Sequence, residues 1–482
     1  MTATAWGGAG LLAVGIILCG SARLWADASD AEAGKPQTHV ETPARNNEAA
    51  EPVAQPVESP SDGKSSEAVE NPTKPAEAFS LRWNDGPVFR AFDNALKLTL
   101  GGYLLYDVGW MEHNLAIQNH VLPNAKTKIG EPAYDNEVRA LRLNVAGTYL
   151  EKVDFKLELD FTGGGQFGRT STGQPAVLSS DATTLKDASV NFRDLFSFAS
   201  LKAGYFKEPF SLENLIGQRY RPFMERALPV GTDRNMGLQA SGAPFDQRMT
   251  WAVGPFVNTD NHGSIDEEKG YSVTGRVTGL PIYADEGRTL IHVALDASYR
   301  DTPDGFRLRA RPEFHLAPFF ADTGTIHGKN LELFDEEAAS VLGPLSFQTE
   351  ILQGTTHGGS GEGRQFDGGY IMASYFLTGE NRPYKRSSGV FELLRPKRNA
   401  GELKDGVRGL GAWELLARGS YLDLNSKGIN GGKLADLTIG VNWYLNAHLR
   451  IMANYILSDV ADNAVSRGGL ENIFGLRFQV NF

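Results

Sequence analysis

The chain has 482 residues, enough for two or three ordinary domains, yet its composition changes only once, near residue 78. The formal net charge is −11 at pH 7, and no segment is basic enough to predict binding to nucleic acid. Cys19 is the single cysteine, and the nine histidines show no close metal-binding spacing. The sequence therefore excludes a disulfide within the chain and predicts no metal site.

The first segment, residues 1–28, has the features of a secretory signal peptide. An apolar stretch over 6–22 is followed by Ala26-Asp27-Ala28, a small-x-small pattern that predicts cleavage after Ala28. No Lys or Arg precedes the apolar stretch, so a single membrane-spanning anchor is the alternative interpretation. Cleavage would also remove Cys19.

Residues 29–78 form a linker rich in Pro, Ala, Glu and Ser, with ten acidic and four basic side chains. Its net charge is −6, and because Arg23 and Asp27 cancel, residues 79–482 carry the remaining −5. A segment with so few large apolar side chains cannot bury enough surface to offset its ordering entropy. We expect a disordered periplasmic tether, which could reach the cell wall.

Residues 79–482 alternate apolar and polar side chains in one segment after another. In 153–161, for example, Phe155 lies on an apolar face and Lys156 on a polar one, and the last such segment ends at the terminal Phe482. This pattern favours an all-β outer-membrane barrel, closed and antiparallel, over a soluble sandwich. Sixteen strands are predicted: 96–110, 137–150, 153–162, 185–194, 198–207, 235–242, 248–258, 270–280, 288–300, 329–342, 345–355, 366–378, 411–423, 433–445, 448–458 and 471–482.

The lengths of the connections support the same interpretation. If the first strand runs outward, the short links fall on the periplasmic side and most long links fall outside, as in outer-membrane barrels. The exception is 379–410, a long segment at a periplasmic position whose fold the sequence leaves open. Sixteen strands enclose an aqueous lumen. The sequence therefore predicts a sixteen-stranded transmembrane β-barrel pore.

Several longer motifs resemble one known family, the phosphate-selective porins of the O and P type. They are FKEPFSLENL (206–215), FMER (223–226), RARPEFHL (309–316), GPLSFQTE (343–350), SYFLTGENRPY (374–384), GAWELLAR (411–418) and LTIGVNWYLNAHLRIMANY (437–455). The resemblance implies a homotrimer of channels in the outer membrane of a Gram-negative-type bacterium. It also implies inward-folded third and fifth loops and a ladder of basic side chains that passes anions.

The sequence departs from the family pattern at three places, and each departure thins the expected ladder. Tyr103 stands where a pore-facing arginine is expected, Arg139-Ala140 replaces consecutive arginines, and Gly419-Ser420-Tyr421 replaces Arg-Tyr-Ser. Phosphate selectivity is therefore less firmly implied than porin function.

The polar faces of the predicted strands, which would line the lumen, carry ten basic and nine acidic side chains. The wall alone should therefore not select anions over cations. Paired wall charges commonly form salt bridges with each other, which is the alternative role for every one of them. The pore-wall candidates are Lys97, Arg142, Lys156, Lys202 and Arg418.

Selectivity should then arise where loops narrow the passage. Guanidinium groups suit phosphate oxygens, and a row of them lets an anion pass between shallow sites. The constriction candidates are Arg219, Arg221 and Arg226 in the third loop (208–234) and Arg307, Arg309 and Arg311 in the fifth (301–328). The alternative is that these arginines clamp the loops to acidic side chains such as Glu213, Glu225 and Glu313.

No catalytic residue and no cofactor is predicted. GGGQFG (163–168) fits a glycine-rich nucleotide-binding pattern but leads into RTSTGQP rather than a helix, and HGGSGEG (357–363) lacks the setting of a hydrolase. The predicted function is passive diffusion of small anions, phosphate or polyphosphate by resemblance, through a water-filled pore. A general or carbohydrate-conducting porin is the alternative, although Tyr103 is the one clear wet-face aromatic side chain of the cleanly alternating strands.

Overall fold

The computed structural model describes residues 79–83, 86–119, 133–162, 167–169, 175–177, 183–196, 198–229, 231–259, 270–359, 363–404, 406–461 and 468–482. The predicted signal peptide (1–28) and tether (29–78) lie outside these ranges. Among the described residues, no helix is both long enough and apolar enough to cross a membrane.

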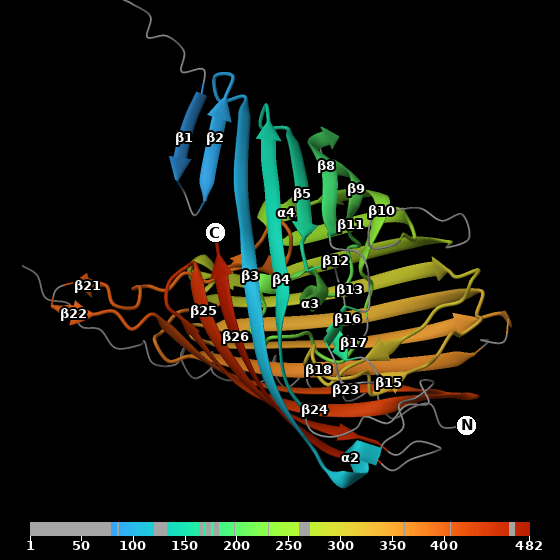
Figure 1. The fold of residues 1–482 in the computed structure, drawn as a ribbon. Helices are drawn as coiled ribbons and strands as arrows, with labels where there is room; N and C mark the ends of the chain where they lie inside the picture. The colour runs from blue at the N-terminus through green and yellow to red at the C-terminus, as the bar shows by residue number, and fades with distance from the viewer. Residues whose placement is uncertain are drawn as a thin grey trace, which may run out of the picture. The chain divides into compact units, whose positions relative to one another are not determined.

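Sixteen long antiparallel strands close into a barrel (Figure 1). Each strand pairs with the next one along the chain, and the last pairs with the first, with Asn481 opposite Tyr103 and Glu471 opposite His113. The barrel strands are β3 (Leu96–His113), β4 (Ala133–Tyr149), β5 (Val153–Asp160), β8 (Thr184–Phe196), β9 (Ala199–Lys207), β10 (Arg234–Gly242), β11 (Met249–Val257), β12 (Tyr271–Ala284), β13 (Thr289–Asp301), β16 (Asn330–Leu342), β17 (Leu345–His357), β18 (Arg364–Phe376), β23 (Ala412–Ser426), β24 (Ile429–Tyr444), β25 (Leu449–Val460) and β26 (Gly469–Asn481). Closure leaves the barrel wall with no unpaired edge, and all sixteen predicted strands are confirmed.

The predicted alternation decides which side chains face outward. Along β26, Phe474 and Phe478 are exposed on the outer face, while Ile473, Arg477 and Gln479 are buried on the inner face. The same period of two residues recurs in the other strands, because successive side chains of a strand point to opposite faces of the sheet.

An additional hairpin precedes the first barrel strand, where the sequence predicted none. It consists of β1 (Phe79–Trp83) and β2 (Pro87–Ala91), and β2 pairs with the first four residues of β3. The strand β26 pairs with β3 only from Tyr103 onward. The hairpin therefore extends the sheet past the chain end of β26, and its short strands carry little periodic signal.

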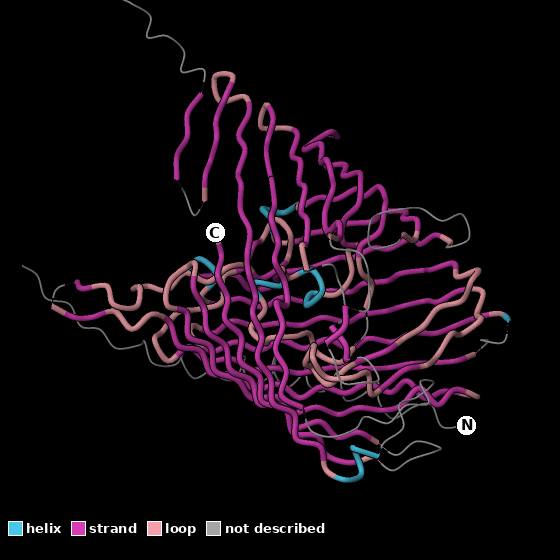
Figure 2. The backbone as a smooth tube through the Cα atoms, in the orientation of Figure 1, coloured by secondary structure: helices cyan, strands magenta, loops and turns pink. Residues whose placement is uncertain are grey.

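The connections are short on one side of the barrel and longer on the other, as predicted, with one exception on each side: the long periplasmic segment 377–411 and the tight turn between β23 and β24. Figure 2 shows the strands in magenta and the loops between them in pink. The turn between β23 and β24 consists of only Lys427 and Gly428. Short elements in the connections are α2 (Leu115–Asn119), β6 (Phe167–Arg169), β7 (Pro175–Val177), α4 (Pro244–Gln247) and η2 (Asp285–Gly287).

Three longer connections place side chains in the barrel interior. The third loop, L3 (208–233), contains α3 (Leu212–Leu215) and η1 (Gln218–Tyr220), and the fifth, L5 (302–329), contains β14 (Arg309–Ala310) and β15 (Ala321–Asp322). The remaining connection is the periplasmic segment 377–411. It contains two hairpins, β19 (Tyr384–Lys385) to β20 (Val390–Phe391) and β21 (Leu403–Lys404) to β22 (Val407–Arg408).

The first hairpin of the periplasmic segment, β19 to β20, folds against the inner wall, whereas the strands of the second hairpin are exposed. Phe391 is fully buried beside Leu290 of β13 and Val341 of β16. A guanidinium nitrogen of Arg276 donates to the carbonyl of Gly389 at 3.1 Å. The first hairpin of the segment therefore packs inside the barrel rather than forming a solvated turn.

The inner wall along β18 and β23 to β26 is apolar where L5 covers it. Phe320 and Ile326 of L5 pack with Phe366, Leu422 and Leu434 of the wall in one buried cluster. These apolar side chains lie on the lumen-facing side of their strands, and L5 shields them from water. The loops thus fill one side of the lumen and leave open space on the other.

Candidate functional site: a loop-lined constriction

The start of L3 is held against the wall by hydrogen bonds to two carboxylates. The backbone nitrogen of Ser211 donates to Asp296 at 2.6 Å, and the Ser211 hydroxyl donates to Glu350 at 2.6 Å. The backbone nitrogen of Glu213 also donates to Glu350, at 2.8 Å. These bonds fix the point at which the loop enters the lumen.

Farther along L3, three arginines of the wall hold the loop by its carbonyls and carboxylates. Arg450 donates to the carbonyl of Arg221 at 2.8 Å. Arg477 bridges Asp107 of β3, at 2.6 Å, and Glu225 of L3, at 2.8 Å. Because the bonds come from the wall strands β25 and β26, they set the distance between the loop and the wall.

The third of these arginines, Arg418, ties L3 and L5 to the same point of the wall. Its guanidinium lies 3.0 Å from a carboxylate oxygen of Glu213 in L3 and 2.6 Å from one of Glu313 in L5. It also donates to the carbonyl of Glu225 at 3.1 Å and lies over the ring of Phe223. Arg418 is fully buried, so it positions both loops and does not face open water.

L5 has a second anchor in which an aromatic ring lies on two glycines. Gly109 of β3 and Gly475 of β26 are directly opposite each other in the register and face the lumen. A Cβ atom on Gly109 would overlap the ring of Phe314, and one on Gly475 would lie 2.8 Å from it. The missing side chains make the flat surface on which Phe314 packs.

Replacing Gly109 by valine should therefore displace Phe314 and loosen L5. Overpacking of this kind costs about 1–3 kcal/mol, and we expect lower thermal stability together with a larger, noisier single-channel conductance. The matched control is Gly419→Ala on β23, where an added Cβ meets nothing within 4 Å. Unchanged conductance and stability in the valine variant would contradict this role for the glycine pair.

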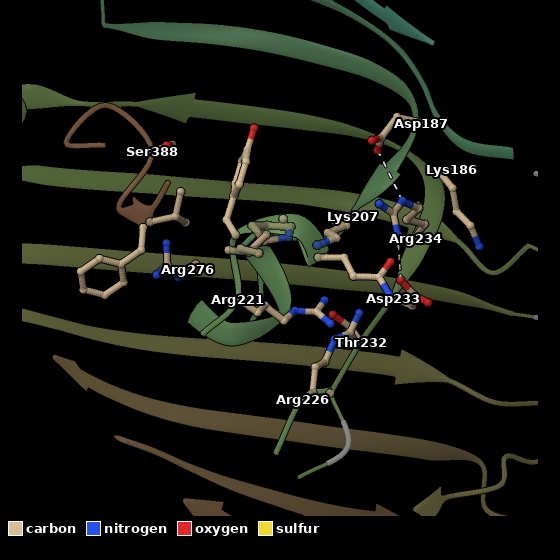
Figure 3. A pocket seen from close by; sticks show the side chains of 18 of the residues that line it. Lys186, Asp187, Lys207, Arg221, Arg226, Thr232, Asp233, Arg234, Arg276 and Ser388 are labelled. Carbon is tan, nitrogen blue, oxygen red and sulfur yellow. Dashed lines mark hydrogen bonds and ion pairs between the residues drawn. The ribbon is translucent and has the colours of Figure 1, made fainter. Parts of the chain in front are cut away.

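Between L3, L5 and the wall of β4 to β11 lies a cavity of about 1810 Å³. Fifteen Lys and Arg side chains and ten Asp and Glu side chains line it, which gives a formal balance of +5. Figure 3 shows part of this lining, where Lys207, Arg221, Arg226 and Arg234 lie close together beside Asp233. The narrowed passage is thus clearly positive, although the predicted wall is nearly neutral.

Seven of the fifteen basic side chains are paired with carboxylates. Arg142 contacts Asp160 at 2.8 Å, and Lys156 contacts Glu158 at 2.9 Å. The other paired bases are Arg139, Arg193, Arg234, Arg276 and Lys385. Pairs of this kind satisfy a polar wall and leave little net field for a passing ion.

Eight basic side chains of the cavity form no ion pair with any described carboxylate: Lys186, Lys202, Lys207, Arg219, Arg221, Arg226, Arg309 and Arg311. Aromatic rings hold several of them. Arg309 and Arg311 each lie 4.2 Å from the ring centre of Phe319, and Lys202 lies 4.1 Å from that of Phe206. Rings of this kind orient a cation without neutralising it.

Among the unpaired cations of the loops, Arg221 and Arg311 lie in an environment that disfavours their charge. Burial, and then the like charge of Arg226, lower the pKa of the Arg221 guanidinium to about 9. Burial likewise lowers the pKa of Arg311 to about 10. Both stay protonated at neutral pH, and an anion entering the cavity would stabilise the charged form. The arrangement can therefore attract anions along a row of uncompensated charges.

Comparison with known proteins agrees with this geometry. Residues 111–482 match the model of one protein family, described as phosphate-selective porin O and P. The chain belongs to this family. Porins O and P are outer-membrane channels, so the barrel lies in the outer membrane and its lumen is the channel.

Two relatives of this porin align over most of its length. An uncharacterised protein of Caulobacter vibrioides is 28% identical over 436 residues, covering 85% of this chain and 79% of the relative. Porin O of Pseudomonas aeruginosa is 24% identical over 368 residues, covering 68% and 78%. Among solved structures, the outer membrane channel DcaP of Acinetobacter baumannii gives a TM-score of 0.47 at 11% identity, covering 80% of this chain and 98% of that one.

The structure brings most of the residues proposed from the sequence into one place in the porin. The cavity lining includes Arg219, Arg221, Arg226, Arg309 and Arg311 from the loops. It also includes the wall residues Arg142, Lys156 and Lys202. Two of these wall residues, Arg142 and Lys156, are paired, so the free charges lie mainly on the loops.

Three of the proposed residues lie elsewhere. Arg307 is not among the cavity-lining residues and pairs with Asp322 of the facing strand β15. Lys97 is near the start of β3 and is not among the lining residues. Arg418 was proposed as a pore-wall charge, and the structure instead places it beneath the loops as their tie to the wall.

Of the seven lining cations that were not among the proposed residues, Arg139 and Lys186 were missed because bulges interrupt the alternation of the porin strands. Arg139 lies at a register shift between β3 and β4, and Lys186 at one between β5 and β8. A bulge adds one residue to a strand and turns a side chain that strict alternation would place outside toward the lumen. Strict period-two counting assigned both residues to the outer face, and nothing in the local sequence marks the shift.

Proposed function

We propose that the porin passes small inorganic anions by passive diffusion and that phosphate is the preferred ion. The observation that carries the proposal is the group of eight basic side chains around one cavity with no carboxylate partner among the described residues. Guanidinium groups bind phosphate oxygens with two parallel hydrogen bonds, and five of the eight are arginines. We also propose a homotrimer, as the family resemblance implies, with lipid against the apolar outer face.

The alternative is a general or carbohydrate-conducting porin, which needs exposed aromatic faces along the lumen. The ring of Tyr103 does line the cavity, but Arg142 lies 5.5 Å and Arg219 5.6 Å from its centre. The ring of Phe319 is similarly covered by Arg309 and Arg311. Guanidinium groups occupy the positions where a sugar would stack, which favours the anion function.

Block of the chloride current by phosphate tests the proposal. In planar bilayers with KCl on both sides, added phosphate should reduce the single-channel current, with half-block at about 1 mM or below, a binding free energy of about −4 kcal/mol. Polyphosphate should also block, because it presents the same oxygens. Block by a neutral oligosaccharide but not by phosphate would support the carbohydrate alternative and reject ours.

A further inference from the structure

A cluster of three carboxylates lies on the inner wall outside the cavity described above. Asp296 of β13 and Asp335 and Glu337 of β16 each offer an oxygen atom, and these atoms all lie within 4.8 Å of one another. All three side chains are buried, and none of them lines the constriction. The cluster lies behind the start of L3, since Ser211 donates to Asp296.

The register of the barrel forces these like charges together. Asp296 and Asp335 are directly opposite each other on neighbouring strands, and Glu337 follows two residues later on the same face. Like charges in directly opposite positions destabilise a sheet. The cost rises with burial, because low polarity strengthens their repulsion. The arrangement therefore needs a compensating positive charge.

The side chains around the cluster compensate only part of the charge. Arg276 donates to Glu337 at 3.0 and 2.6 Å, and His292 lies 3.1 Å from the same carboxylate. Asp296 accepts from Ser211 and lies 3.5 Å from Arg276. Three carboxylates and one guanidinium leave a formal charge of −2, before the neighbouring carboxylate of Glu350 is counted.

Asp335 carries the strongest indication of a ligand. Its side chain is 1% exposed, and neither of its carboxylate oxygens accepts a hydrogen bond from any residue that the structure describes. Buried polar atoms are almost always paired, and a bare buried carboxylate costs several kcal/mol. The neighbouring Glu350 differs, because Ser211, Glu213 and Tyr370 all donate to it. Asp335 thus faces the cluster with two free acceptors.

We propose that Asp296, Asp335 and Glu337 bind a divalent cation, with Ca²⁺ as the best fit. Ca²⁺ takes oxygen ligands at 2.3–2.6 Å, so two of its ligand atoms lie up to about 5 Å apart, which matches the observed spacing. A charge of +2 neutralises the cluster. Zinc is disfavoured, because His292 is already bonded to Tyr384 and Glu337 through its two ring nitrogens.

The bound cation would stiffen the wall at the point where L3 attaches. It would join β13 to β16 and hold Asp296 in place to accept from Ser211 of the loop. The sequence gives no sign of this site, because L5 separates its two ligand-bearing strands along the chain and only the register of β13 on β16 brings the three carboxylates together. The proposal does not depend on the anion preference of the pore.

Calcium titration of the chelator-treated, lipopolysaccharide-free refolded porin tests the site. We expect calorimetry to show one bound Ca²⁺ per chain and the thermal unfolding temperature to rise with Ca²⁺. Asp335→Asn should weaken Ca²⁺ binding at least about tenfold, or about 1.4 kcal/mol. The matched control is Glu336→Gln, which removes a charge from the next residue on the outer face of the same strand and should bind Ca²⁺ as the wild type does.

Several results would overturn the proposal. Wild-type protein that binds no Ca²⁺, or Asp335→Asn protein that binds it as tightly as the wild type, would each do so. An unfolding temperature that does not change with Ca²⁺ but rises on acidification would show that protons neutralise the cluster instead. If Asp335→Asn does not refold, by its heat-modifiable mobility on gels, Glu337→Gln provides the same comparison, and equal binding there rejects the site.

Discussion

Replacing Arg221, Arg226 and Arg309 together by glutamine is expected to remove most of the anion preference of the channel. The three guanidinium groups line the cavity and have no carboxylate partner among the described residues. At 4 Å, one such charge attracts an anion by about 4 kcal/mol at an effective dielectric constant of 20. Salt and water reduce this energy, but about 1.4 kcal/mol suffices for a tenfold change in selectivity. The anion-to-cation permeability ratio should therefore fall by about tenfold or more.

A matched control is available in the same loop. Arg307 lies two residues before Arg309, yet it pairs with Asp322 and is absent from the cavity lining. Arg307→Gln should leave the reversal potential in a KCl gradient unchanged. If the triple variant kept the wild-type permeability ratio while Arg307→Gln lowered it, the assignment of the selective charges to the cavity would be wrong.

The second large effect is expected at Arg418, which should govern the stability of both inward loops. Arg418→Leu leaves Glu213 and Glu313 buried without their cation. Breaking a buried ion pair on one side costs about 3–5 kcal/mol. We expect a lower unfolding temperature and a larger, fluctuating conductance, because L3 and L5 lose their common tie to the wall. Differential scanning calorimetry and single-channel recording measure the two effects.

Two further variants separate the role of the Arg418 fork from that of a wall charge. Arg418→Lys keeps the charge but cannot bond both carboxylates with a planar fork, so an intermediate loss of stability is expected. Lys433→Met breaks the partly exposed pair with Asp423 and should cost at most about 1 kcal/mol. Equal stability of the Arg418→Leu and Lys433→Met proteins would show that Arg418 does not hold the loops.

The barrel could be predicted from the sequence because its signal is local and repeated. Each strand needs one apolar and one polar face, so the alternation within a segment such as 153–161 is enough to predict a strand there. The prediction needs no information about the neighbouring strands. The hairpin β1 to β2 escaped prediction, since each of its strands has only five residues. The periplasmic segment 377–411 also escaped, because its packing depends on wall residues distant in sequence.

The sequence predicted which loops and strands supply the charges of the candidate site, but not which of these charges are paired. Arg307 and Arg309 are both arginines and lie two residues apart in L5. Only the fold shows that Arg307 pairs with Asp322 while Arg309 has no carboxylate partner among the described residues. The sequence likewise predicts Arg418 to be a charge of the pore wall. Only the structure shows that its guanidinium contacts both L3 and L5. Pairing depends on cross-strand register and loop path, which no local pattern encodes.

The reversal potential of the wild-type channel in a KCl gradient tests the central claim most directly. If the unpaired cations of the cavity select the ion, the potential has the sign of chloride permeation and moves toward zero as the salt concentration rises and screens the charges. A reversal potential with the sign of potassium permeation would contradict the account.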